Sequence, residues 1–312
     1  MRIKRLLLTF ILLSFCLIIF GQESAYDLTN QFIINSIKGK TSAEQIKKLD
    51  AYPLEKIVDA CSKNITDSLI NIRNAAFDLV YIMSMRKMDD PYTNRVVNLF
   101  LNGCNDKDAG IVYDCLKYLK YFKSTSFDAE ARIKLSQMAR QASIPHYDLL
   151  IRITGLAGIT DLMYDYADMI RQKKYADNKI RWALHVALAR LGDQQEITYC
   201  LSKAEQAKIS DDIVYDLLPD LAYIRNKEAF DFMLEIINSD EKNCSSSNPD
   251  SEAKIICAFR IIKLVAPYIN DFPVKLDKAG NLIARDYDQM LISVRQWIQN
   301  NKSTYTLNVQ IY

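Results

Sequence analysis

The sequence predicts an all-α protein in which about six helix pairs stack into an α-α superhelix. Glycine and proline are scarce, at 8 and 7 of 312 residues, whereas a large sheet with many tight turns needs more of both. Apolar residues make up 49% of the chain, which is enough for a sizeable core. They recur at helical spacing, in paired segments that repeat every 33–39 residues, and such a period is typical of an α-solenoid.

Residues 1–21 have the layout of a secretory signal peptide. Three basic residues lie within the first five positions, an apolar run continues to Phe20, and Gly21 stands just before the expected cleavage site at Gln22. The run is shorter than the roughly 20 residues that span a bilayer as a helix. Retention as a membrane anchor is the alternative. Once the signal is removed, we expect no membrane insertion.

The residues around the expected cleavage site, Ile-Ile-Phe-Gly-Gln at 18–22, resemble export signals of the Bacteroidetes group. This resemblance implies export to the periplasm or cell envelope. Removing the three basic residues of the signal lowers the formal net charge from +2 to −1. A nearly neutral remainder gives no electrostatic reason to expect binding to nucleic acid or to an anionic membrane.

Polar breaks divide the mature chain into a lead with a capping helix (22–52), a repeat region (53–267) and a C-terminal cap and tail (268–312). Aspartates, prolines and glycines at these breaks mark helix starts and stops. First helices are expected to start near Pro53, Tyr92, Asp128, Asp161, Gln194 and Lys227. Second helices are expected to start near Asp67, Asp108, Tyr147, Asp177, Asp211 and Ser251.

The segment from Asp177 to Asp193, with the sequence DNKIRWALHVALARLGD, resembles the second helix and following turn of a HEAT repeat, an armadillo-type helical repeat. In that family an aspartate precedes a Val/Ile-Arg pair, alanines follow, and Leu-Gly-Asp ends the unit. Weaker copies begin at Asp67 and Asp148, and the resemblance covers residues 53–267. The aspartate can cap the helix, and Gly192 suits the left-handed conformation that ends it.

The C-terminal part departs from the repeat pattern. Residues 272–283 alternate polar and apolar side chains around a Lys-Ala-Gly-Asn turn, which predicts a small hairpin or extended excursion. An amphipathic helix is expected over 287–300, as a cap on the stack. The tail, 303–312, is β-prone but too short to form a domain.

Six cysteines follow the signal segment, which permits disulfides in an exported chain. Two pairs are the best candidates: Cys244 with Cys257, which flank a polar loop, and Cys61 with Cys104, near the ends of successive first helices. The alternative is that these cysteines are buried, small apolar thiols.

No motif for catalysis or cofactor binding occurs, and we assign no catalytic, cofactor-binding or metal-binding residues. The chain has two histidines, His146 and His185, which limits histidine chemistry; packing or capping is the favoured role of both. Asp161, Asp165 and Asp168 share a helical face and could hold a hard cation, although a solvated face is the more common outcome.

We therefore expect a non-catalytic module that binds a protein or peptide partner, as HEAT-like proteins generally do on their curved inner face. Two alternatives stay open: an enzyme with a site assembled across repeats, and a structural subunit of an envelope complex. The oligomeric state is not predicted. On repeat position, the residues expected to line the inner face are Lys117, Tyr121, Arg152, Arg181, His185 and Tyr215.

Overall fold

The computed structural model describes residues 24–246, 250–277 and 280–312, and these residues form a mostly helical protein. The expected signal peptide, 1–21, lies outside the described residues. Within the described part, no helix combines the length and the apolar character that a membrane span requires. The chain divides into two compact units, unit 1 up to Ile111 and unit 2 from Val112 to Tyr312.

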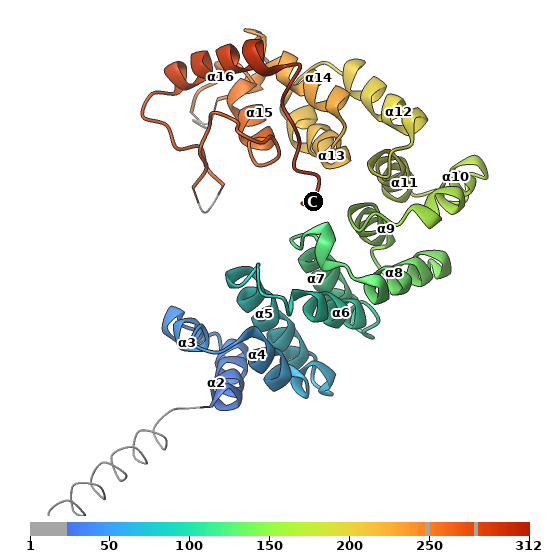
Figure 1. Cartoon of the computed structure of the whole chain (residues 1–312), viewed down its shortest axis with the longest axis vertical. Coiled ribbons are helices and arrows are strands. Elements are labelled where there is room, and N and C mark those ends of the chain that lie inside the picture. Colours follow the sequence, from blue (N-terminus) through green and yellow to red (C-terminus); the bar gives the residue numbers. More distant parts are fainter. Residues whose placement is uncertain (1–23, 247–249, 278–279) are drawn as a thin grey trace, which may run out of the picture. The chain divides into compact units, whose positions relative to one another are not determined.

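Unit 1 is formed by helices that pack directly on one another. Helix α2 contacts α3, α4 and α5, and α5 contacts both α4 and α6 (Figure 1). The bounds are α2 Ala25–Ile37, α3 Ala43–Leu49, α4 Leu54–Cys61, the 3-10 helix η1 Asn64–Thr66, α5 Ile70–Arg86 and α6 Thr93–Gly103. The next helix, α7 (Ala109–Leu119), crosses the boundary between the units.

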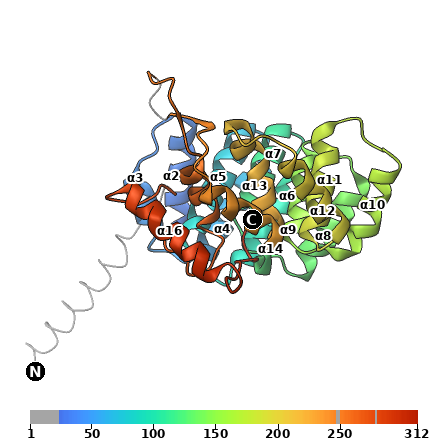
Figure 2. The same ribbon diagram turned by 90° about the horizontal axis from the view of Figure 1, so that it is seen from above.

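The helices of unit 2 follow one another from green to red in Figure 1 and are seen from above in Figure 2. The bounds up to the middle of the unit are η2 Ser124–Ser126, α8 Ala129–Gln141, α9 Tyr147–Leu156, η3 Thr160–Leu162, α10 Met163–Arg171, α11 Asn178–Arg190 and α12 Gln194–Glu205. Then come the π-helical turn η4 Ile213–Leu217, α13 Leu218–Ile224, α14 Lys227–Asn238, α15 Ala258–Val265 and α16 Tyr287–Asn301. Helix α8 contacts α9, each helix from α10 to α14 contacts the next one along the chain, and α11 also contacts α9 and α13.

Capping residues explain many of the helix starts. The side chains of Asp128, Asp177, Asp193 and Asn226 each accept a hydrogen bond from a backbone N–H in the first turn of α8, α11, α12 and α14. Such a bond satisfies a donor that would otherwise have no partner within the helix. The helix starts lie within three residues of the expected positions in the first five pairs and at the first helix of the sixth, when the π-helical turn at Ile213 is taken as the start of the second helix of the fifth pair.

The second helix of the sixth pair was predicted at Ser251, which is wrong: α15 begins at Ala258. The strands β1 (Cys244–Ser245) and β2 (Lys254–Ile255) pair antiparallel before it. A disulfide then joins Cys244 to Cys257. The described residues 250–257 therefore lie outside the helix.

The C-terminal part contains a bridge between Leu276 and Leu282, on either side of the predicted turn. Helix α16 follows, close to the expected span. The described lead residues form α2 and α3, and α2 buries Leu28, Phe32 and Ile33. The lead is therefore a packed helical part of unit 1, with one helix more than predicted.

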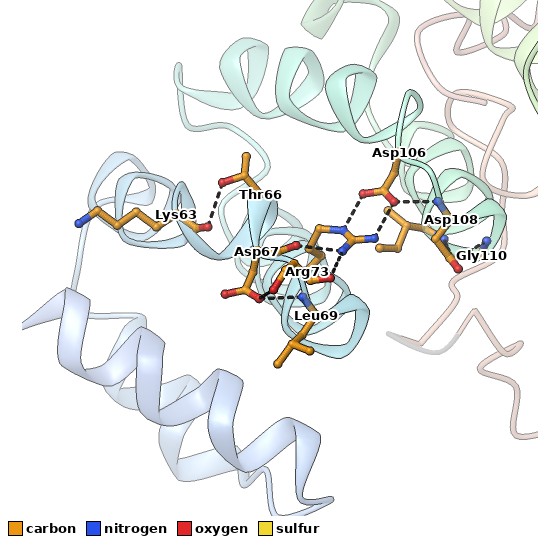
Figure 3. Close-up of polar contacts among 10 residues, drawn as sticks. Lys63, Thr66, Asp67, Leu69, Arg73, Asp106, Asp108 and Gly110 are labelled. Atoms are coloured by element: carbon orange, nitrogen blue, oxygen red, sulfur yellow. Dashed lines mark hydrogen bonds and ion pairs between the residues drawn. The ribbon is translucent and has the colours of Figure 1, made fainter.

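An arginine of unit 1, Arg73, has a structural role, drawn in Figure 3. Arg73 on α5 is buried, and its Nε and Nη2 each donate to one carboxylate oxygen of Asp106 over 2.8 Å. Its Nη1 donates to the carbonyl oxygens of Asp67 and Ser68. Asp106 also accepts from the backbone N–H of Asp108, just before α7. Arg73 thus ties the turn before α5 to the turn before α7.

Candidate functional site

The most distinctive polar site of unit 2 surrounds the chain's own residues 306–312. After α16 this segment runs back across the unit, past α13 (Figure 1). It is contacted mainly through its main chain, because the backbone oxygens of six residues accept hydrogen bonds from elsewhere in the unit. Those residues are Thr306, Asn308, Val309, Gln310, Ile311 and Tyr312. We call the residues that donate to this segment, together with Tyr223 and Lys120, the tail groove.

Arg190, the last residue of α11, contributes two of these bonds. Its Nη2 donates to the carbonyl of Val309 over 2.5 Å and to that of Ile311 over 3.1 Å. Its Nη1 donates to the carbonyl of Tyr223 on α13 over 2.6 Å, which fixes the guanidinium plane. Burial lowers the pKa of Arg190, since the carbonyl dipoles only partly replace water around the charge.

Arg225 follows α13 in the left-handed conformation, with φ of 57°. Its Nε donates to the carbonyl of Asn308 over 3.1 Å, and its Nη2 donates to the carbonyls of Ile311 and Tyr312. The guanidinium carbon lies 3.5 Å from the centroid of the Tyr268 ring. Burial lowers the pKa of Arg225 to about 10.

Backbone groups complete the recognition of the segment. The N–H of Ser124 in η2 donates to the carbonyl of Gln310 over 2.6 Å, and the N–H of Asn270 donates to that of Thr306 over 3.0 Å. In return, the N–H of Asn308 donates to the carbonyl of Tyr268. Leu307 and Ile269 form an antiparallel bridge. The segment is therefore strand-like at Leu307, and it bends at Gln310, whose N–H donates to Oδ1 of Asn308.

Side-chain recognition is concentrated at Tyr312. Its ring centroid lies 4.7 Å from that of Tyr223, and Nζ of Lys120 lies 4.4 Å from the Tyr312 centroid. Burial raises the pKa of the Tyr312 phenol to about 12 and lowers the pKa of Lys120. By contrast, Val309 is 56% exposed and Gln310 is exposed. The tail groove therefore contacts this segment mainly through its main chain and through the Tyr312 ring.

An ion pair beside the groove joins three helices. Both Nη groups of Arg152 on α9 donate to the carboxylate of Asp220 on α13. Trp182 on α11 donates through Nε1 to the same carboxylate over 2.6 Å. Burial disfavours the charge of Arg152, but the attraction of Asp220 outweighs it and raises the pKa of Arg152. Arg152, expected on the inner face, thus lies half-buried in this pair.

Two other predicted residues, Arg181 and His185, line one open depression of about 500 Å³ together with Trp182 and Tyr199. Nδ1 of His185 lies 2.5 Å from an oxygen of Glu196. The His185 ring stacks on Tyr199 with centroids 4.4 Å apart. This arrangement of aromatic rings beside a cation is suited to contacting a planar or polar surface group.

The remaining predicted residues are exposed but are not brought into one cluster. Nζ of Lys117 lies 5.9 Å from the Tyr113 ring, and Tyr121 is 50% exposed. Tyr215 is 62% exposed and lies beneath the guanidinium of Arg260. His146, at the start of α9, lies against Tyr113 with ring centroids 5.0 Å apart.

The candidate cation face is occupied by an arginine. Arg140 donates to Asp161 over 3.0 Å and to Asp165 over 2.9 Å, and Asp168 contacts Arg171. Among the described residues, no group of three or more histidine, cysteine, aspartate or glutamate side chains is arranged to hold a metal ion. The guanidinium of Arg140 is therefore the cation that Asp161 and Asp165 bind.

Of the two candidate cysteine pairs, Cys244 and Cys257 form a disulfide. The pairing of Cys61 with Cys104 is wrong, because both are buried, reduced thiols. Each fills a core position near the end of its helix. Burial raises the pKa of Cys61 to about 12.

Sequence reasoning missed Arg190, Arg225 and the segment they bind. Arg190 stands in the Ala-Arg-Leu-Gly-Asp end of the best repeat, and the β-prone character of 303–312 was visible. Their meeting depends on contacts between positions more than 80 residues apart, which no local pattern encodes.

No protein-family model, no curated protein and no solved structure matches the chain.

Proposed function

We propose that the protein is a non-catalytic binding module, exported to the cell envelope, which holds a protein or peptide partner on a HEAT-like helical solenoid. The observation that supports it most is the tail groove, because unit 2 already holds an extended segment through six main-chain carbonyls. A surface that satisfies the backbone polar groups of one extended segment is chemically suited to another.

The packing of unit 2 supports the solenoid part of the proposal. The second helices α9, α11 and α13 contact one another in sequence order, and the first helices α8, α10 and α12 each contact the second helix of their own or the preceding pair. Gly155 on α9 lies close to Ala187 on α11, in keeping with the small residues of the repeat motif. Stacking of this kind buries a continuous core between units that could not bury it alone.

The test uses the exposed residues that the repeat pattern singles out. The purified protein and a variant with Lys117→Ala, Tyr121→Ala, Arg181→Ala and Tyr215→Ala are immobilised, and each is exposed to an envelope extract of the source organism. Captured proteins are then identified by mass spectrometry. The proposal expects a defined set of proteins on the parent protein and its loss on the variant, with an unchanged melting temperature.

A matched control carries Tyr164→Ala, Lys208→Ala and Arg285→Ala, three substitutions at other exposed positions. This control should capture the same proteins as the parent. Equal capture by all three proteins, or capture by none, would contradict the proposal. A variant that loses its fold would show that the substituted residues are structural.

A further inference from the structure

The segment 306–312 contacts the tail groove in a way that a purely structural tail does not require. It has no charged side chain, yet it lies against the buried cation Arg225 and the half-buried cations Arg190 and Lys120. Packing alone would be achieved by apolar side chains, and it would not need one buried and one half-buried guanidinium group.

The two guanidinium groups act together on the main chain. Arg190 donates to the carbonyls of residues 309 and 311, and Arg225 donates to those of 308, 311 and 312. A guanidinium presents several N–H donors in a rigid fork, so neighbouring carbonyls of an extended chain can be held at fixed spacing. These bonds do not depend on the side chains between them.

The side chains of the segment differ in how closely the tail groove contacts them. Val309 and Gln310 point into solvent to a large extent, whereas the ring of Tyr312 is enclosed between Tyr223 and Lys120. An aromatic ring supplies large contact area and a cation–π contact at small entropic cost. The side chains of Tyr312 and of Thr306, whose Oγ1 accepts from Asn270, are therefore contacted directly. The exposed Val309 and Gln310 are held through their backbone.

We infer that residues 306–312 are an internal occupant of a peptide-binding groove, and that the groove's partner is an extended peptide with an aromatic residue at the place of Tyr312. This inference rests on the proposed binding function and names its site and ligand class. The tail must leave before such a partner binds. Because the tail is tethered, it competes at an effective concentration in the millimolar range, about 1 mM for a short linker.

The probe is a fluorescent peptide with the sequence of residues 306–312, Thr-Leu-Asn-Val-Gln-Ile-Tyr, and binding is followed by fluorescence anisotropy. It is titrated into the full chain and into a chain that ends at Tyr305. The shortened chain should bind the peptide about tenfold or more tightly than the full chain does, because the competing segment is absent. Circular dichroism shows whether the shortened chain is folded.

Two control peptides separate the two modes of recognition. A peptide in which the exposed Val309 and Gln310 are exchanged should bind within about threefold of the parent, since the backbone oxygens at both positions are kept. A peptide with Tyr312→Ala should bind about tenfold more weakly. A chain with Arg190→Gln should lose affinity, and one with the exposed Arg285→Gln should not.

If the shortened chain does not fold, the full chain with Tyr312→Ala takes its place. That variant should bind the parent peptide more tightly than the unsubstituted full chain, because its own tail competes less well. Absence of binding to a folded shortened chain, or equal affinity for the full and shortened chains, would overturn the inference. Capture of envelope proteins in the earlier experiment would then still support the binding function, so the two failures are distinguishable.

Discussion

Arg190 and Val309 are separated by 119 positions in the sequence, yet Nη2 of the arginine donates to the carbonyl of the valine over 2.5 Å. The same arginine also holds the carbonyl of Tyr223, so one side chain joins the end of α11, helix α13 and the tail. This contact fixes residues 306–312 in the tail groove of unit 2.

Replacement of Arg73 by glutamine should destabilise unit 1 by about 2 kcal/mol. The substitution removes the cation of a buried ion pair and leaves the carboxylate of Asp106 without its partner. Urea unfolding followed by circular dichroism measures the change. Arg171→Gln is the matched control, since the pair of Arg171 with Asp168 is exposed and should contribute less than about 1 kcal/mol. Equal losses for the two variants would contradict the structural role of Arg73.

The contribution of the Arg73–Asp106 pair should also depend on pH. Burial alone would raise the pKa of Asp106, but the hydrogen bonds from Arg73 and the backbone of Asp108 outweigh it and lower that pKa. A lowered folded-state pKa gives stability that is present above the unfolded value of about 3.9 and is lost as the pH falls through the folded value. The stability difference between the parent and Arg73→Gln should thus be constant from about pH 5 to 7 and shrink below about pH 4. A difference that stays constant at lower pH would show that the ion pair is not its source.

Substitution of Gly155 by alanine should lower stability by about 1–3 kcal/mol, because the added methyl group overpacks a close helix crossing. A Cβ at this position would overlap Oη of Tyr223 and lie 3.3 Å from Cα of Ala187. The hydroxyl of Tyr223, which donates to the carbonyl of Arg152, would have to move. Thermal unfolding provides the measurement. Adding Tyr223→Phe to this variant should restore part of the lost stability, because the clashing hydroxyl is removed. A further loss of stability would show that the added methyl group does not clash with that hydroxyl.

The cysteines should separate into two classes in an alkylation experiment with iodoacetamide. The described thiols at Cys61, Cys104, Cys115 and Cys200 are buried, so they should react only after denaturation. Burial also raises the pKa of Cys61 and Cys200 to about 12, which keeps them protonated at the pH of the experiment. Cys244 and Cys257 should react only after reduction. Peptide mapping by mass spectrometry identifies the labelled positions, and labelling of Cys244 in denatured but unreduced protein would rule out the bridge.

Most of the helix starts could be predicted from residues close to them in the sequence. Asp128, Asp177 and Asn226 occupy cap positions in the structure, and a capping side chain acts on backbone groups two or three residues away. Sequence patterns can therefore predict such starts. The start of α15 was missed because the disulfide between Cys244 and Cys257, together with the short strand pair before it, keeps the preceding chain out of the helix.

The candidate site was predictable only where its residues are close in sequence. Arg181 and His185 are one helical turn apart, and they line one depression. Arg152 was expected on the inner face from its repeat position, but its partner Asp220 lies 68 positions away. Arg190 and Arg225 depend on the path of the tail, which is determined by tertiary packing. No repeat pattern contains that information.

The most direct test of the central claim locks the tail in its groove and asks whether the groove is then closed to peptides. Cysteines are introduced at Ser124 and Gln310, whose backbones are hydrogen-bonded over 2.6 Å, and the oxidised double variant is compared with the same protein after mild reduction. The single variant Ser124→Cys under both conditions controls for the native disulfide. The account predicts that the fluorescent peptide of residues 306–312 binds about tenfold or more tightly once the lock is opened. Equal binding to the locked and the opened protein would contradict it.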